Sequence, residues 1–458
     1  MLTLHAALAL TLNPAAPAIV SVVGGGGKSN AVFRLAKDAH AASGCRAIIT
    51  HTARIAAFQH AWAPAVVETD GDAELPWAAI AAALYAYGCL LLTGPMAGDR
   101  RQGIAPAQVD ALARRAAELG VGLITVEADG SKMRPVKAPD SHEPVVPDST
   151  THLLPTMGLD AIGAPIDGRG VHRPELVRAV LGLDPATPVR LTPAHVAQLL
   201  TDPTSGAKAR PSAARLVPLL NKADTPLRLA YGRLTAHLLA ALGTPALVAA
   251  LLNEAPPVIE RWGPVATIVL AAGGSTRLGR PKQMEPVQGA PMVVWAVEKA
   301  LAAAAGPVVV VTGAYADPVV TALAAAGLLP AVTIVPNPAW ASGLASSVHV
   351  ALAALPPATA AAIFLPVDQP LLDPVLLRRL MQAWRSGAPI AAPTVDGQLR
   401  GAPSLFDRSF FGKLAAVTGD VGGRDLLLAH RDVVVGVPAD PAWLLDVDRP
   451  EDLAVMVG

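Results

Sequence analysis

The sequence predicts an α/β protein made of two three-layer α/β/α domains. Short apolar runs such as residues 18–23 and 267–270 have the composition of buried parallel strands. Segments with helical spacing of apolar residues, such as 293–305 and 375–384, alternate with such runs in the second half. The chain has 458 residues, more than a single core usually serves. These observations favour two α/β units in succession.

A domain boundary is expected near residue 255. Residues 254–257 and 261–264 combine prolines with charged and small residues, a composition typical of linkers. The predicted domains are therefore residues 1–255 and 264–458.

Composition excludes several classes of protein. Lys and Arg total 36, as do Asp and Glu, and aromatic residues make up 4%, so no basic, base-stacking surface for nucleic acid is expected. Cys45 and Cys89 are too far apart in sequence for a soft-metal motif and fit a reducing compartment. Polar residues interrupt each apolar run before about 18 residues, so no membrane span is expected. Residues 1–23 lack the basic start of a signal peptide, and a cytoplasmic location is expected.

A glycine-rich loop with two cations follows the strand-like run that ends at residue 270. Gly273 and Gly274 let backbone amides approach phosphate oxygens, and Ser275 can add a hydroxyl donor. Arg277 can fork onto phosphate oxygens, and Lys282 can act as a point charge. The spacing Gly-Gly-x-x-Arg-x-Gly-x-x-Lys is far more restrictive than a pair of glycines. It predicts a nucleoside triphosphate site; the alternative is a strand-to-helix turn with two solvated cations.

A carboxylate follows another apolar run, residues 361–365. Asp368 falls just beyond this run, at the sheet edge where ligands of open α/β sheets collect. A carboxylate there suits Mg²⁺, which completes its shell with phosphates and water. The alternative is that Asp368 caps the helix that follows Pro370.

The second half resembles the MobA-like nucleotidyltransferases, and among them the molybdenum cofactor cytidylyltransferases. Five segments carry the resemblance in chain order: 270–282, 340–348, 365–370, 419–424 and 446–452. The resemblance implies a Rossmann-like fold and nucleotide contacts by Ala271, Ala272, Gly273, Gly274, Ser275, Lys282, Gly343 and Ser347.

The same resemblance assigns catalytic roles to Arg277, Lys282 and Asp368, and places Mg²⁺ on Asp368 and Asp448. Asp448 follows residues 443–445, which read as a strand, and Asp446 is an alternative to it. Capping of the last helix is a further interpretation of both carboxylates.

The implied reaction moves CMP from CTP to molybdopterin-bound molybdenum cofactor and releases pyrophosphate. Ala272 favours CTP over GTP within the resemblance. Ala402 stands where similar cytidylyltransferases have His or Asn, and Arg449 stands where they have Thr. Two other functions therefore stay open: transfer to a sugar phosphate or other small phosphorylated acceptor, and a non-catalytic carrier or chaperone of molybdenum cofactor.

The first half opens with a second glycine loop, between a strand-like run and the helical pattern at 31–36. The loop consists of Gly24, Gly25, Gly26, Gly27, Lys28 and Ser29. Strand, glycines, Lys-Ser and helix form the arrangement of a P-loop, with amides on phosphates and the Ser29 hydroxyl toward Mg²⁺. The first glycine of that motif is replaced by Val22, so a tight turn without ligand is the alternative.

Two further segments fit nucleotide binding. Residues 121–126 form a strand-like run that delivers Glu127 and Asp129 to its end, where a metal or water ligand lies in P-loop proteins. Asn221, Lys222 and Asp224 have the spacing of a guanine-reading motif; a helix cap is the alternative.

The first half resembles the YqeC family, which is described as an accessory of selenium-dependent molybdenum hydroxylases. The matching segments are 23–29, 127–131, 137–139, 142–144 and 171–175. Both halves thus point independently to molybdenum hydroxylase maturation, with a hydroxylase as the implied partner of a P-loop-like domain.

Overall fold

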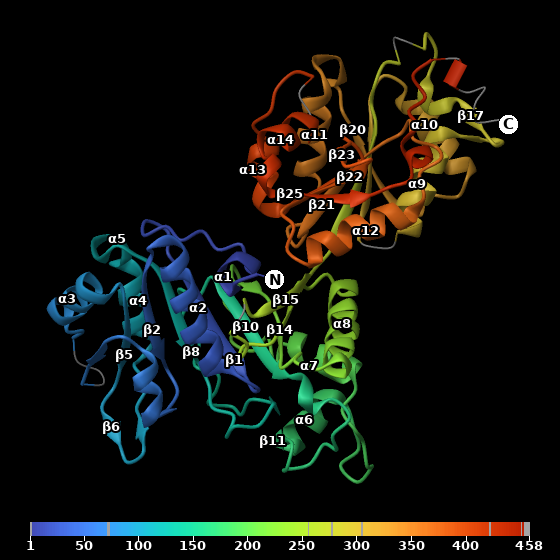
Figure 1. Ribbon diagram of the computed structural model, residues 1–458. Helices are drawn as coiled ribbons and strands as arrows, with labels where there is room; N and C mark the ends of the chain where they lie inside the picture. The colour runs from blue at the N-terminus through green and yellow to red at the C-terminus, as the bar shows by residue number, and fades with distance from the viewer. Residues whose placement is uncertain are drawn as a thin grey trace. The chain divides into compact units, whose positions relative to one another are not determined.

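Figure 1 shows the computed structural model, which describes residues 2–70, 74–254, 256–275, 278–303, 306–420, 423–449 and 451–452, without the side chain of Arg424. The chain forms two compact units, unit 1 (Met1–Trp262) and unit 2 (Gly263–Gly458). Within these described ranges, no helix combines the length and the apolar character needed to cross a membrane.

Unit 1 is built on a large, mainly parallel sheet. Its strands are β1 (Ala18–Gly24), β2 (Arg46–His51), β4 (Val66–Glu68), β5 (Cys89–Thr93), β8 (Val121–Glu127), β10 (His152–Gly158), β12 (Arg215–Leu216), β13 (Leu219–Asn221), β14 (Ala246–Ala249) and β15 (Val258–Trp262). They lie in the order β15-β14-β13-β10-β1-β8-β2-β5-β4, and β12 pairs with β10. Strand β1, which leads into the first glycine loop, lies between β8 and β10 and is parallel to both.

Helices cover both faces of this sheet. They are α1 (Leu4–Ala7), α2 (Lys28–Ser43), α3 (Trp77–Tyr87), α4 (Pro106–Arg114), α5 (Ala116–Leu119), α6 (Pro174–Leu181), α7 (Pro193–Thr201) and α8 (Pro226–Ala241). Side chains of α1 and α2 pack in one core cluster with Val20 and Val22 of β1. Side chains of α3 and α4 pack in another with Ile19 and Val23. Because neighbouring strand residues point to opposite faces, these clusters lie on opposite sides of the sheet.

Two small sheets lie outside the main one. Strands β9 (Val136–Lys137) and β11 (Val171–His172) form a parallel pair, and β3 (Ile55–Ala56), β6 (Met96–Ala97) and β7 (Arg100–Arg101) form the other sheet. The β9–β11 pair places His172 opposite Lys137.

The end of unit 1 differs from the predicted boundary at residue 255. Residues 258–262 form β15, which pairs antiparallel with β14 at the edge of the main sheet. Val258 and Trp262 are buried there. The apolar side chains and the strand pairing therefore extend this unit to Trp262, although the local composition reads as a linker.

Unit 2 contains a mixed sheet. Its strands are β16 (Val265–Ala271), β19 (Val308–Thr312), β20 (Val332–Pro336), β21 (Ala361–Pro366), β22 (Ile390–Val395), β23 (Gln398–Leu399), β24 (Ser404–Asp407) and β25 (Val434–Pro438). The order is β20-β19-β16-β21-β24-β22-β23, and β25 pairs with β22. Strands β20, β19, β16 and β21 are parallel to one another, whereas β24 is antiparallel to β21. A short hairpin of β17 (Pro286–Val287) and β18 (Ala290–Pro291) precedes the first helix.

The helices of unit 2 again form two layers. They are α9 (Met292–Ala302), α10 (Ala316–Ala325), α11 (Leu344–Ala353), α12 (Pro374–Arg385), α13 (Phe411–Leu414) and α14 (Gly423–Ala429). Helices α9, α10 and α12 pack with Val269 of β16 in one core cluster, and α11 and α13 pack with Ile268 in another. The predicted α/β class with two three-layer units is thus confirmed.

One predicted strand is wrong. Residues 443–445 were expected to be extended, but Pro441–Leu444 forms a short 3₁₀-helix. Proline at its first position and the Asp440 carboxylate, which accepts a hydrogen bond from Ala442 N–H, begin this turn.

Candidate functional site

The glycine-rich loop of unit 2 begins where β16 ends at Ala271. Ala271 and Ala272 are buried, so they position the loop from inside the core. Among the described residues, a Cβ on Gly273 would meet nothing within 4 Å, so this side of the backbone is open to a phosphate. Ser275 has a φ of 51°, in the left-handed region. Thr276 and the predicted catalytic Arg277 lie outside the described residues.

Gln283 holds this loop in place, which the sequence did not indicate. Its buried side-chain amide donates to the carbonyls of Ala271 at 3.0 Å and Gly273 at 2.7 Å. Its Oε1 accepts from the Ser275 hydroxyl, which itself accepts from Lys282 N–H at 2.9 Å. The Ser275 hydroxyl is therefore occupied by the loop itself in this structure. The only sequence signal for Gln283 is its position next to Lys282.

Lys282 brings the two predicted metal carboxylates together. Its Nζ lies 2.9 Å from Oδ2 of Asp368 and 2.7 Å from Oδ1 of Asp448. Burial opposes the charged form of Lys282, but attraction to these carboxylates outweighs burial and raises the pKa of the ammonium. Residues that lie far apart in the sequence thus meet at the carboxyl ends of β16 and β21.

Asp368 also carries an unsatisfied oxygen. Its Oδ1 is buried and has no hydrogen-bond partner among the described residues. A buried carboxylate oxygen without a partner calls for an explanation, and a bound ion is one. Together with Asp448, this oxygen offers the hard ligands that Mg²⁺ prefers. The described ranges contain no group of three or more His, Cys, Asp or Glu side chains arranged for a metal, so such an ion would depend on its substrate and water for further ligands.

Asp446, the alternative to Asp448, faces a different partner. Its Oδ1 accepts from Nε2 of Gln369 at 3.0 Å, and no ion pair joins it to Lys282 among the described contacts. Burial and the nearby charge of Asp368 raise the pKa of Asp446. Asp452 accepts from Asp448 N–H at 2.8 Å and fixes the turn that carries Asp448. The geometry therefore favours Asp448 as the partner of Asp368.

The two remaining predicted nucleotide contacts lie at the start of α11. Gly343 precedes this helix with a φ of 112°, and an added Cβ would collide with the backbone of Gly419. The Ser347 hydroxyl is buried and accepts from Nδ2 of Asn337 at 3.0 Å. Gly343 is thus required for close packing of two loops, while Ser347 is held in the interior by Asn337.

Trp340 links this segment to the glycine-rich loop. A Cβ on Gly274 would lie 2.8 Å from Cζ3 of Trp340, so the indole packs directly on the glycine backbone. The Tyr315 hydroxyl donates to the carbonyl of Gly274 at 3.3 Å. Trp340 remains 37% exposed, so part of its ring faces solvent beside the loop. Sequence reasoning missed both aromatic residues because their contact with Gly274 is tertiary.

In unit 1 the first three loop glycines bind protein acceptors. Gly24 N–H donates to both oxygens of Asp129, at 2.9 and 3.1 Å. Gly25 N–H donates to the carbonyl of Thr156, and Gly26 N–H donates to the carbonyl of Arg134. Donors that remain for a ligand are the amides at 27–30, because Gly27 precedes α2 and no side chain caps that helix.

The predicted Lys28, Ser29, Glu127 and Asp129 meet at the end of β1. Lys28 Nζ donates to the carbonyl of Gly24 at 2.7 Å and lies 3.4 Å from Asp129 and 3.8 Å from Glu127. The Ser29 hydroxyl donates to Glu127 at 2.7 Å. Burial raises the pKa of Glu127. These four side chains therefore form one polar cluster around the first glycine loop.

The guanine-reading pattern has structural partners instead. Asn221 Nδ2 donates to the carbonyl of Gly26 at 2.7 Å, so Asn221 ties β13 to the glycine loop. Lys222 pairs with Asp160, and Asp224 pairs with Arg228. Helix α8 is capped one residue later, by Thr225.

Comparison with known proteins agrees with this division. Residues 267–433 match the family described as MobA-like NTP transferase domain, and residues 20–175 match the family described as YqeC protein. The chain is 34% identical over 206 residues to protein YqeC of Escherichia coli (strain K12), covering 45% of this chain and 76% of that protein. It is 35% identical over 170 residues to nicotine blue oxidoreductase of Paenarthrobacter nicotinovorans, covering 36% of this chain and 81% of that protein.

Among solved structures, the chain is similar to Rv0371c from Mycobacterium tuberculosis H37Rv. The identity is 30%, with coverage of 42% of this chain and 97% of that one, and the TM-score is 0.38. The two family matches and the Escherichia coli relative show that the chain belongs to the YqeC family in its first part and carries a MobA-like NTP transferase domain in its second, and it is a nucleotidyltransferase.

Proposed function

We propose that unit 2 transfers CMP from CTP to molybdopterin-bound molybdenum cofactor and releases pyrophosphate. The observation that carries this proposal is the convergence of Lys282, Asp368 and Asp448 beside the glycine-rich loop. A largely buried cation flanked by two carboxylates, one with an unsatisfied oxygen, suits a triphosphate bound together with a divalent ion. The choice of CTP and molybdenum cofactor rests on the sequence resemblance to the cytidylyltransferases.

Each part of the site has a distinct role in this proposal. The open backbone at Gly273 receives phosphate oxygens, and Lys282, whose N–H donates to Ser275 of the same loop, supplies a positive charge. Asp368 and Asp448 would hold Mg²⁺, which supplies charge neutralisation for the pyrophosphate leaving group. No covalent intermediate on the protein is required, because an oxygen of the acceptor phosphate attacks the α-phosphorus directly.

The acceptor would lie beside Gln369. Nε2 of this residue donates to Asp446 and lies 3.4 Å from the carbonyl of Ala402. Ala402 is the position where similar cytidylyltransferases have His or Asn, and Gln369 joins it to the carboxylate cluster. Ala402 offers no polar side chain there, which keeps a sugar phosphate or another small phosphorylated acceptor as a competing substrate.

We further propose that the 24–29 loop of unit 1 binds nucleotide phosphates and that the chain serves a molybdenum hydroxylase. Support comes from Lys28 at the helix start and from the amides at 27–30.

The match to nicotine blue oxidoreductase gives a second candidate, a redox activity. The paired carboxylates beside Lys282 have no evident use in redox turnover of a dye, which makes nucleotidyl transfer the first choice. A non-catalytic cofactor carrier is the third candidate.

The deciding experiment incubates the full-length protein with Mg²⁺, each nucleoside triphosphate in turn and molybdopterin with or without molybdate. Pyrophosphate and the nucleotide product are measured. Release that requires both CTP and the molybdenum-loaded acceptor supports the proposal, and release only with sugar phosphates favours the other acceptor class. Turnover of nicotine blue without pyrophosphate favours the redox candidate, and tight cofactor binding without turnover favours a carrier.

A further inference from the structure

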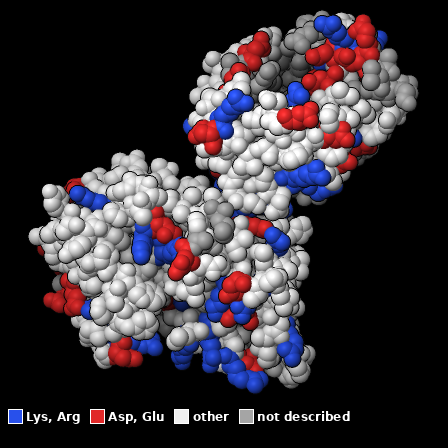
Figure 2. Space-filling model, viewed as in Figure 1, with Lys and Arg blue, Asp and Glu red and all other residues white. Residues whose placement is uncertain are grey.

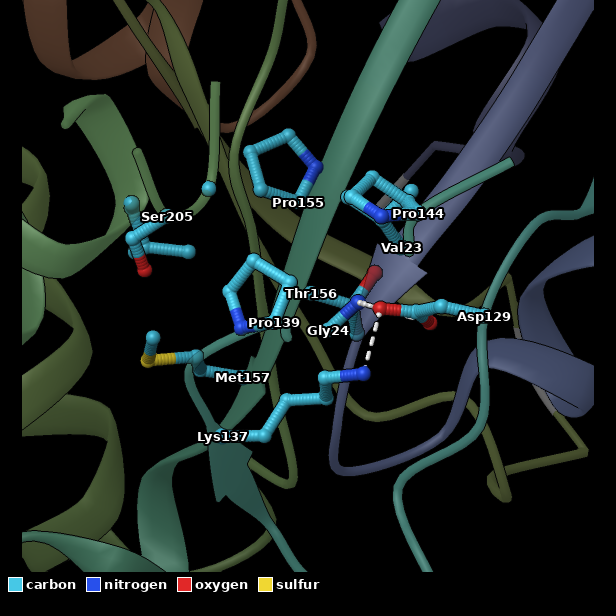
Figure 3. A pocket seen from close by; sticks show the side chains of 12 residues that line it. Val23, Gly24, Asp129, Lys137, Pro139, Pro144, Pro155, Thr156, Met157 and Ser205 are labelled. Carbon is cyan, nitrogen blue, oxygen red and sulfur yellow. Dashed lines mark hydrogen bonds and ion pairs between the residues drawn. The ribbon is translucent and has the colours of Figure 1, made fainter. Parts of the chain in front are cut away.

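Two buried lysines converge on one carboxylate beside the first glycine loop. Lys137 Nζ lies 3.0 Å from Oδ2 of Asp129, and Lys28 Nζ lies 3.4 Å from Oδ1 of the same residue. The carboxylate also accepts Gly24 N–H. Figure 3 shows Lys137, Asp129 and Gly24 in contact. Two ammonium groups and a loop amide are the donors that recognise a phosphate group, and here they surround an aspartate.

Further charges continue from this point toward α6. Lys137 Nζ also lies 2.6 Å from Glu143, which pairs in turn with Arg173. Arg173 precedes α6. Figure 2 shows Lys and Arg side chains gathered over the part of unit 1 that holds β11 and α6. Burial, more than the neighbouring charges of Arg173, Lys137 and Lys132, lowers the pKa of His172. The ammonium groups of Lys28 and Lys137 are thus the cations that Asp129 contacts directly.

A pocket adjoins the same carboxylate. Asp129, Lys137 and Gly24 line it together with Pro139 and Ser205, and Figure 3 shows these side chains around the space. Ser205 is 2% exposed, and its buried hydroxyl has no hydrogen-bond partner among the described residues. A buried hydroxyl without a partner calls for a polar group in this pocket.

We propose that Asp129 is an internal substitute for phosphate, and that Lys137 is a second lysine of the anion site of unit 1. A polyphosphate anion binds at the 24–30 loop by displacing the Asp129 carboxylate from Gly24 N–H and from both lysines. This inference rests on the proposed phosphate binding by unit 1. It assigns Lys137 a role in binding, and it makes Asp129 a competitor of the ligand in the absence of metal.

The test measures binding of tripolyphosphate to the full-length protein by calorimetry in EDTA, so that no metal contributes. Asp129→Asn keeps the size of the side chain and removes its charge. We expect it to bind the anion about tenfold more tightly than wild type, because the lysines lose a competing counter-ion. A misfolded variant cannot produce a gain in affinity. Equal or weaker binding by folded Asp129→Asn protein overturns the inference.

Lys137→Gln should weaken the same binding about tenfold, whereas Lys37→Gln, at an exposed position on α2, should leave it unchanged. Equal effects of the two substitutions contradict the role of Lys137. Unit 2 is the same in all of these proteins, so differences in tripolyphosphate binding between them come from unit 1.

A crystal structure of the wild-type protein with tripolyphosphate supplies a second measurement. We expect an anion oxygen on Gly24 N–H and the Asp129 side chain turned away. An anion bound while Asp129 stays on Gly24 N–H overturns the inference.

Lys28→Gln separates this inference from the proposal beneath it. If Lys28→Gln removes one binding site but Asp129→Asn gains no affinity, only the inference fails. If neither substitution changes the titration, unit 1 does not bind phosphate, and the proposed function of the loop fails as well.

Discussion

The Nζ atom of Lys282 lies 2.7 Å from Oδ1 of Asp448, across 166 positions of sequence. The same Nζ lies 2.9 Å from Asp368, so a single cation sets the spacing of two carboxylates from separate parts of unit 2. The glycine-rich loop positions the lysine, since Lys282 N–H donates to the Ser275 hydroxyl. Lys282 thus joins the loop to both carboxylates, which supports the proposal that they form one site.

Removing the charge of Asp368 should abolish most of the activity. Asp368→Asn takes away a ligand for the divalent ion, and we expect kcat to fall about a hundredfold or more, as for loss of a preorganised electrostatic contact. Pyrophosphate release is the measurement, and Asp432→Asn, at an exposed position in unit 2, is the control. Activity of Asp368→Asn within a few-fold of wild type rules out its assigned role.

The two carboxylates near the end of unit 2 should differ in effect. Asp448→Asn removes an ion pair with Lys282, whereas Asp446→Asn changes only the hydrogen bond from Gln369. We expect Asp448→Asn to lower kcat at least about tenfold more than Asp446→Asn does. The Mg²⁺ dependence of kcat is measured in both variants. A larger loss in Asp446→Asn than in Asp448→Asn would assign the metal to Asp446.

The two glycines of the loop should respond differently to alanine. Gly273→Ala adds a methyl group in open space, so we expect unchanged stability and a raised KM for the nucleotide. Gly274→Ala pushes a methyl group against Trp340, which we expect to lower stability by about 1–3 kcal/mol and to alter tryptophan fluorescence. Thermal unfolding and steady-state kinetics separate these effects. Equal losses of stability would mean that Gly273 is packed as tightly as Gly274.

Gln283 should matter for stability as well as for activity. Gln283→Ala leaves the carbonyls of Ala271 and Gly273 without their donor, so we expect a loss of about 1–3 kcal/mol in unit 2. Denaturant unfolding measures it, with Gln398→Ala at an exposed position as the matched control. If both variants are equally stable, Gln283 does not hold the loop.

Glu143 should make the stability of unit 1 depend on acidic pH. Burial opposes its ionisation, but Lys137 and Arg173 outweigh burial and lower the pKa from 4.5 to about 2. Because the pKa of Glu143 is lower in the folded state than in the unfolded state, its ionised carboxylate stabilises the folded state fully above pH 4.5. This stabilisation is lost as the pH falls toward 2. The difference in thermal midpoint between wild type and Glu143→Gln should therefore be constant above pH 5 and shrink below it. A difference that does not change down to pH 2 contradicts the ion pairs.

The sequence predicts those parts of the structure that depend on neighbouring residues. Buried runs such as residues 267–270 and the glycines that follow them identify the strands and the glycine-rich loops, because composition and spacing are local signals. Asp368 could be placed at a sheet edge for the same reason.

Features set by tertiary contacts could not be predicted. Gln283, Trp340 and Lys137 acquire their roles from residues that only the fold brings near them. The stretch at 443–445 looks extended by composition, yet Asp440 and Pro441 turn it into a 3₁₀-helix. Strand pairing likewise keeps residues 258–262 in unit 1, although they follow one linker-like segment and overlap the next.

The most direct measurement of the central claim is a crystal structure of the full-length protein with Mg²⁺ and a nonhydrolysable CTP analogue. The account predicts the triphosphate against Gly273 and Lys282, with the metal on Asp368 and Asp448. A nucleotide bound elsewhere, or Lys282 still paired with both carboxylates while the analogue is bound to unit 2, would contradict it.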